Sequence, residues 1–89
     1  MSVRVRGFIA QVMERISIEK RFGASVLSLR KRRGMTQAEL SQRVGLQRTY
    51  ISELERGKRN VSLKNAERLA DALGVSVSSL FSRGSAART

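Results

Sequence analysis

The chain contains no cysteine, no histidine and no proline. Without cysteine it forms neither a disulfide nor a thiolate nucleophile, and the absence of histidine removes the commonest general base and most zinc sites. The seven acidic residues are scattered among 18 lysines and arginines, with no paired-carboxylate spacing. No glycine-rich phosphate-binding loop is present either. We therefore expect a protein that is not an enzyme and has no catalytic residues, metal site or cofactor.

Aromatic residues and long apolar runs are scarce as well. The 89 residues include three phenylalanines, one tyrosine and no tryptophan, so the core must be built from Leu, Ile, Val and Ala, as in a small helical bundle. No apolar run approaches the roughly 18 residues of a membrane span, and the first residues lack the pattern of a signal peptide. We expect one small cytoplasmic domain without membrane contact.

Positive charge, in contrast, is abundant. The formal net charge is +11, which gives a field that attracts nucleic acid, anionic lipid or an acidic protein. A basic amphipathic membrane peptide at the N-terminus is disfavoured because Glu14 and Glu19 interrupt its basic face. The sign of the charge predicts a polyanionic partner without choosing among the other candidates.

Helical periodicity and capping signals divide the centre of the chain. Apolar residues recur at a spacing of three and four across residues 22–33, and a run of cations at the end of this segment suits the negative end of a helix dipole. Thr36 followed by Glu39 is a capping box, which predicts a short second helix ending at Gly45. Ser41 is small enough to let two helices approach.

Three further helices are predicted after Gly45. The third has an inward stripe of Tyr50, Ile51 and Leu54 and ends by Gly57. Ser62 can cap a fourth helix, whose apolar positions keep the 3.6-residue period of a helix: Leu63, Ala66, Leu69, Ala70 and Leu73. The segment "VSVSSLF" then predicts a fifth helix capped by Ser76 or Ser78.

The two ends of the chain differ from its centre. Residues 1–20 form an N-terminal extension that is helical or flexible, and an extra helix is possible from about Gly7 to Ile16, with an apolar face of Phe8, Ile9, Val12, Met13 and Ile16. Residues 82–89, "SRGSAART", contain no apolar residue larger than alanine and are expected to be a flexible tail. The predicted domain therefore covers residues 21–81.

The order of these features is that of a helix-turn-helix, in which the second helix of the motif is held out to enter the DNA major groove. The segments "RKRRGMTQAEL", "ISELERGKR" and "LADALGVSVSSLF" carry the resemblance, in this order and spacing. From Phe22 to Phe81 the chain resembles the phage repressor and Cro family, the XRE-type helix-turn-helix domain. The resemblance implies an all-α fold, a compact bundle of five helices. "RTYISELERGKRN" is also similar to the controller proteins of restriction-modification systems.

The resemblance implies specific roles for side chains in and around the third helix. A recognition helix of about residues 47–56 would present its base-reading residues to the major groove: Gln47, Arg48, Thr49, Ser52 and Glu53. Arginine at position 48 would pair with guanine, and Glu53 would accept from a cytosine amino group or orient Arg48. Phosphate contacts would come from Gln37, Tyr50, Arg56, Lys58, Arg59 and Asn60. Arg30 and Glu55 match a structural ion pair between helices one and three.

Several side chains have two readings. Tyr50 either packs against the domain with a polar tip or reaches the sugar-phosphate backbone. Val77, Leu80 and Phe81 either close the core or form a two-fold dimer interface. Gln47 replaces the usual Ser, Thr or Asp cap of the recognition helix, which predicts either a weaker cap or a cap made by the side-chain amide.

The function favoured by these features is a sequence-specific regulator of transcription that binds double-stranded DNA as a homodimer. Its operator would be a pseudo-palindrome with half-sites about one helical turn apart. It would control its own gene and either block RNA polymerase or contact it. One alternative is an antitoxin whose residues 5–16 bind a partner protein, and another is a non-specific nucleic-acid or bridging factor.

Overall fold

The computed structural model describes residues 17–81 as an all-α domain. Its helices are α2 (Ile18–Arg32), α3 (Gln37–Val44), α4 (Arg48–Glu55), α5 (Leu63–Leu73) and α6 (Val77–Phe81). No strand occurs between residues 17 and 81, and the predicted five-helix bundle is confirmed. The possible helix from about Gly7 to Ile16 and the predicted tail of residues 82–89 lie outside the described residues.

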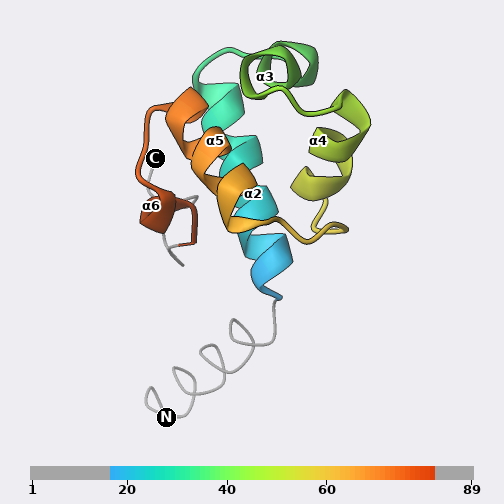
Figure 1. Ribbon diagram of the computed structural model, residues 1–89, viewed down its shortest axis with the longest axis vertical. Helices are drawn as coiled ribbons and strands as arrows, with labels where there is room; N and C mark the ends of the chain where they lie inside the picture. The colour runs from blue at the N-terminus through green and yellow to red at the C-terminus, as the bar shows by residue number, and fades with distance from the viewer. Residues whose placement is uncertain (1–16, 82–89) are drawn as a thin grey trace, which may run out of the picture.

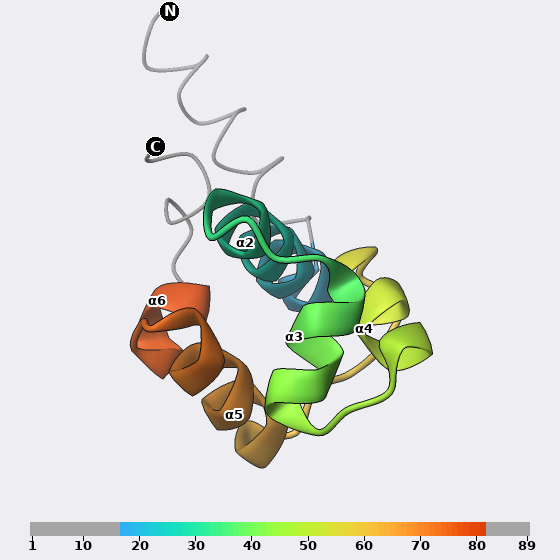
Figure 2. The ribbon, with the colours of Figure 1, turned by 90° about the horizontal axis from the view of Figure 1, so that it is seen from above.

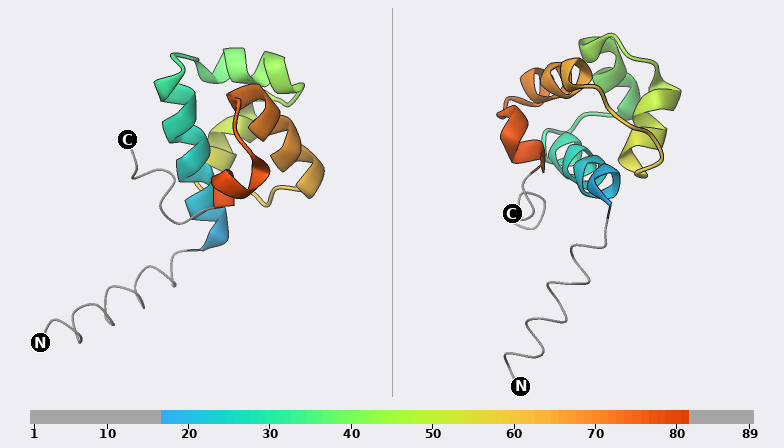
Figure 3. Two further views of the ribbon diagram at one scale, coloured as in Figure 1. Left: turned by 90° about the vertical axis from the view of Figure 1, so that its left-hand side faces the viewer. Right: turned by 60° about the horizontal axis from the view of Figure 1, so that its bottom comes forward.

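Helix α2 is the central element against which the others are arranged. It contacts α4, α5 and α6, while α3 bridges α4 and α5 at one end of the bundle (Figure 1). Seen from above, α4 and α6 lie on opposite sides of the domain (Figure 2). The two further views agree, with α6 beside the N-terminal half of α2 (Figure 3). The bundle thus presents α4 on one side and α6 on the other.

The helix boundaries follow from local caps. Ser17 has extended backbone angles, and its hydroxyl accepts a hydrogen bond from the Lys20 amide at 3.1 Å. This cap starts α2 at Ile18, four residues before the predicted start at Phe22, and the helix runs across the predicted domain boundary at residues 20 and 21. The apolar repeat did not show this first turn because most of it faces solvent.

The predicted capping box is confirmed. The Glu39 amide donates to the Thr36 hydroxyl at 3.0 Å, and the Thr36 amide donates to Glu39 Oε1 at 2.8 Å. The hydrogen bond from the Thr36 backbone lowers the pKa of Glu39. Both bonds satisfy amides that α3 itself leaves without partners, so this turn fixes where the first helix of the motif begins.

The core is built from aliphatic side chains supplied by every helix, as the composition indicated. Its fully buried members include Val26, Leu40, Ile51, Leu54, Leu69, Leu73 and Leu80. Phe22 packs beside Phe81, with ring centroids 4.8 Å apart, and this contact ties α6 to α2. Leu80 is 0% exposed, so the prediction that it forms part of a dimer interface is wrong for this side chain: it closes the core instead.

Two close approaches determine how the helices of the motif sit. A Cβ atom at Gly23 would lie 2.1 Å from the Leu54 carbonyl oxygen, which shows that α2 and α4 cross with almost no space between them. Between α3 and α4, Gly45 has φ of 71°, and the Ser41 hydroxyl donates to the Leu46 carbonyl. The predicted tight turn and the small residue beside it are confirmed.

Within residues 17–81, no helix is long and apolar enough to cross a bilayer.

Candidate nucleic-acid interface

Helix α4 has a buried side and an exposed side. Ile51, Leu54 and Glu55 are buried against α2 and α3. The predicted base-reading residues lie on the remaining surface, where Gln47, Arg48 and Thr49 are exposed and Ser52 and Glu53 are half-buried. The structure therefore brings this set together on one side of one helix, and its contact with bases stays a prediction.

The start of α4 is held by the turn rather than by a side-chain cap. Gln47 has the extended backbone angles of an N-cap, but its side chain accepts no hydrogen bond from the helix amides. The predicted weak cap is confirmed. Instead, the Leu46 amide donates to the Ser41 carbonyl at 3.2 Å, which anchors the segment just before α4 to the end of α3.

A buried ion pair lies beneath the motif. Arg30 of α2 donates from Nε to Glu55 Oε2 at 2.7 Å and from Nη2 to Oε1 at 3.0 Å, while its Nη1 donates to the Met35 carbonyl at 2.8 Å. The two side chains are 9% and 3% exposed. The hydrogen bond to Glu55 raises the pKa of Arg30. The predicted structural pair is confirmed, and it locks the end of α4 to α2 and to the loop before α3.

Gln37 belongs to the same network. This first residue of α3 donates from Nε2 to Glu55 Oε1 at 3.0 Å, so a single carboxylate joins α2, α3 and α4. The family resemblance implied that Gln37 contacts a phosphate, and it did not suggest this bond. The half-buried side chain instead fixes the start of α3 relative to α4, and its contact with DNA stays a prediction.

The loop after α4 carries the predicted phosphate-binding residues, of which Arg56, Lys58, Arg59 and Asn60 are all exposed. Arg59 Nη1 binds Glu53 Oε1 at 2.9 Å, and its guanidinium carbon lies 5.0 Å from the centre of the Tyr50 ring. Sequence reasoning missed the Glu53 contact because a separation of six residues across the end of a helix matches no helical spacing rule. The loop thus folds back over α4.

Tyr50 packs inside this loop with its hydroxyl engaged. The hydroxyl donates to the Asn60 carbonyl at 3.2 Å and accepts from Asn65 Nδ2 of α5 at 3.5 Å. The ring is half-buried against the core. This arrangement supports the packing reading of Tyr50, with a polar tip that ties α4 to the loop and to α5.

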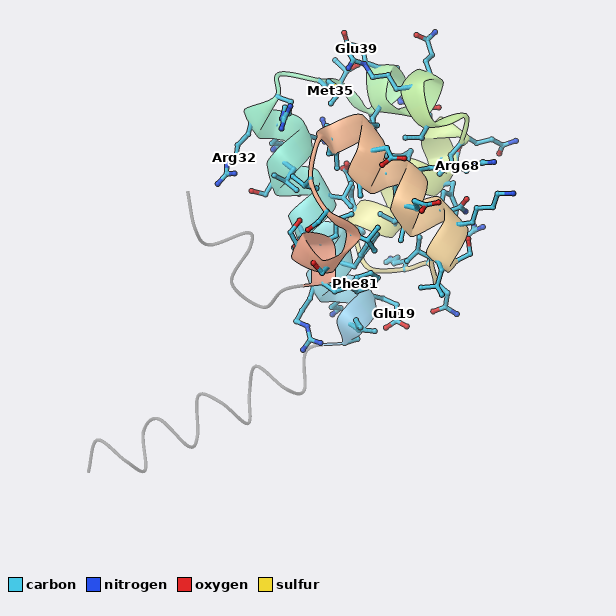
Figure 4. The ribbon with its side chains drawn as sticks, turned by 60° about the vertical axis from the view of Figure 1, so that its left-hand side comes forward. Glu19, Arg32, Met35, Glu39, Arg68 and Phe81 are labelled. Atoms are coloured by element: carbon cyan, nitrogen blue, oxygen red, sulfur yellow. The ribbon has the colours of Figure 1, made fainter. Side chains whose placement is uncertain are left out.

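An apolar pocket lies beside the loop that follows α4, and its polar lining comes from Glu19, Arg59 and Asn60. It has a volume of about 280 Å³, and its apolar lining consists of Ile18, Phe22, Val61, Leu63 and Phe81. Leu63 is 81% exposed and Ile18 is 48% exposed. Phe81 and Glu19 lie at the end of the domain opposite Met35 and Glu39 (Figure 4). Of the predicted dimer residues, Val77 and Phe81 are half-buried, and Phe81 is the one that lines this pocket.

Comparisons with known proteins agree with this geometry. A family model described as helix-turn-helix matches residues 26–80. The control protein C.MunI of Mycoplasma sp is 44% identical over 66 residues, which are 73% of this chain and 89% of that protein. Control protein C.BamHI of Bacillus amyloliquefaciens is 49% identical over 55 residues, covering 61% of this chain and 68% of that protein.

A solved structure shows the same arrangement of helices. The restriction-modification controller protein C.AhdI from Aeromonas hydrophila has a TM-score of 0.68 and 40% sequence identity, and the match covers 70% of this chain and 94% of that chain. The resemblance inferred from the three sequence motifs is thereby confirmed. The chain belongs to the XRE-type helix-turn-helix family of DNA-binding transcription regulators, and its relatives there include controller proteins of restriction-modification systems.

Proposed function

We propose that this regulator binds a specific operator as a dimer, with α4 in the major groove, and that it controls its own gene. The observation that carries the proposal is the exposed side of α4, where Gln47, Arg48 and Thr49 project from a helix fixed by the buried Arg30–Glu55 pair. A rigid helix with exposed hydrogen-bonding side chains is what direct reading of base edges requires. The likeness to the control proteins supports the regulatory part of the proposal.

A salt titration tests this function. Binding to the DNA just upstream of the protein's own gene is measured beside a scrambled duplex of equal length. We expect the upstream duplex to bind about a thousandfold more tightly near physiological salt. Equal binding to both duplexes, with a steep loss as salt rises, would leave only an electrostatic attraction to nucleic acid and would reject the proposal.

Arg48 is the residue on which base reading depends most. Replacing it by alanine should cost about 1–3 kcal/mol of specific binding and relax the preference at one base pair in each half-site, because a bidentate contact to guanine is lost. Affinity for single-base operator variants gives the measurement. Arg68→Ala is the matched control, since Arg68 is an exposed cation on α5 outside the predicted site. Unchanged discrimination in the Arg48 variant would remove this residue from the reading set.

Dimerisation is proposed to use the apolar pocket that α2, α5, α6 and the loop between α4 and α5 form together. Leu63 and Ile18 are the large exposed apolar side chains of residues 17–81, and both line this pocket beside Phe81. A two-fold contact through the patch would cover apolar surface that now faces water. The interface therefore shifts from the predicted Val77, Leu80 and Phe81 cluster toward Phe81, Leu63 and Ile18.

Leu63→Glu tests this interface. It should raise the dimer dissociation constant by about tenfold or more, because a charge replaces a central apolar contact. The fold should persist, since Leu63 is exposed at the first position of α5, where an acidic residue suits the helix dipole. Lys64→Gln, which changes the net charge by the same amount at the neighbouring exposed position, should leave dimerisation unchanged. Sedimentation equilibrium provides the readout, and equal dissociation constants for the two variants would place the interface elsewhere.

A further inference from the structure

The contacts around Glu53 give Arg59 a role that differs from a simple phosphate contact. Glu53 lies on α4 among the predicted base-reading residues, and its Oε1 binds Arg59 Nη1 at 2.9 Å. A side chain that binds a DNA phosphate would be expected to extend away from the protein toward the DNA backbone. Arg59 instead points back onto the recognition helix, with half of its side chain exposed.

Arg59 is held in this position from two directions. The Tyr50 ring lies under its guanidinium at 5.0 Å, a cation–π geometry. The chain around it is fixed because the Lys58 amide donates to the Glu53 carbonyl at 2.9 Å and the Tyr50 hydroxyl donates to the Asn60 carbonyl at 3.2 Å. The loop therefore presents Arg59 to the Glu53 carboxylate as a fixed partner.

An unpaired carboxylate at this place would oppose DNA binding. Glu53 is 32% exposed on a surface that, by the proposed function, lies against phosphates and loses water when DNA binds. Like charges repel more strongly as water is excluded, whereas the attraction between Glu53 and Arg59 grows for the same reason. The pair can thus enter the groove with no net charge.

We infer that Arg59 is a positioning residue that holds Glu53 for recognition of a cytosine amino group, an inference that rests on the proposed function. Arg59 binds Oε1 and fixes the rotamer of Glu53, and Oε2 accepts from the cytosine N4 amino group in the major groove. Specificity at that base pair then depends on two residues, one in α4 and one in the loop, although only Glu53 touches the base.

The two roles of Arg59 predict different consequences of its removal. Loss of a phosphate contact weakens binding to every sequence alike and flattens the salt dependence by about one unit. Loss of a positioning residue removes the preference at one base pair in each half-site and leaves the other preferences unchanged. The second pattern must also match the pattern produced by changing Glu53 itself.

The experiment selects bound duplexes from a random double-stranded pool with the full chain and compares base preferences after sequencing. Glu53→Gln, Arg59→Ala and the double variant are tested beside wild type, with Lys58→Ala as the control for loss of one neighbouring exposed cation. Thermal unfolding checks that each variant is folded, and a small change is expected because the Glu53–Arg59 pair is partly exposed to solvent.

We expect the preference of both single variants for the same cytosine to fall about tenfold. Their base preference at the position read by Arg48 should stay unchanged. The double variant should lose no more than either single one, because the two residues act as one unit. Lys58→Ala should weaken all sequences together. The inference is overturned if Arg59→Ala behaves like Lys58→Ala, or if Glu53→Gln keeps the cytosine preference. A wild-type protein that selects no sequence would instead reject the proposed function.

Discussion

Replacing Glu55 by alanine is expected to destabilise the folded domain by about 3–5 kcal/mol, because the change leaves a buried cation without its partner. Arg30 is 8% exposed, and its Nε and Nη2 both donate to this carboxylate. Gln37 loses its acceptor at the same time. Domains of this size are stable by roughly 5–15 kcal/mol, so the loss is a large part of the total. Chemical denaturation followed by circular dichroism measures it.

Two controls separate the buried charge from other effects. Glu53→Ala removes a carboxylate of the same helix that is 32% exposed, and it should cost less than about 1 kcal/mol. The double variant Arg30→Met with Glu55→Leu should recover much of the lost stability, since neither member then leaves a charge in the core. If Glu55→Ala lowers the free energy of unfolding no more than Glu53→Ala does, the Arg30–Glu55 pair contributes no more than an exposed ion pair. It would then not be what holds α4 against α2.

Gly23→Ala is expected to lower the free energy of unfolding by about 2–3 kcal/mol. The loss is expected even though alanine is more favourable than glycine inside a helix by about 1 kcal/mol. The added Cβ would lie 2.1 Å from the Leu54 carbonyl oxygen and 3.0 Å from that of Glu55. Both atoms belong to backbone and cannot rotate away, so α2 and α4 must separate. We expect the separation to lower DNA affinity as well, because α4 loses its fixed position relative to α3.

The matched control is Gly45→Ala. At Gly45 a Cβ atom would meet nothing within 4 Å, and the cost comes from the left-handed backbone alone, with φ of 71°. That strain is worth about 1–2 kcal/mol. Urea denaturation of both variants gives the comparison. A Gly23→Ala protein as stable as wild type would show that α2 and α4 have room to adjust at this crossing.

Much of the motif could be read from the chain without coordinates. The Thr36–Glu39 capping box, the turn at Gly45 and the inward stripe of α4 all depend on residues within four positions of one another, and local geometry fixes such features. The order of the motifs also identified the family, and with it the Arg30–Glu55 pair. That pair spans 25 residues, so the resemblance predicted it where periodicity could not.

The tertiary structure decided which of the remaining polar and apolar side chains meet. Leu80 belongs to the core and not to a dimer surface because α6 returns onto α2. Gln37 bonds Glu55 across 18 residues, and Arg59 reaches Glu53 because the loop reverses over Tyr50. Such contacts depend on how helices cross and loops turn, which no spacing rule along one helix encodes. The sequence by itself thus determined the helices and the motif, and helix packing determined the partners of the side chains around the recognition helix.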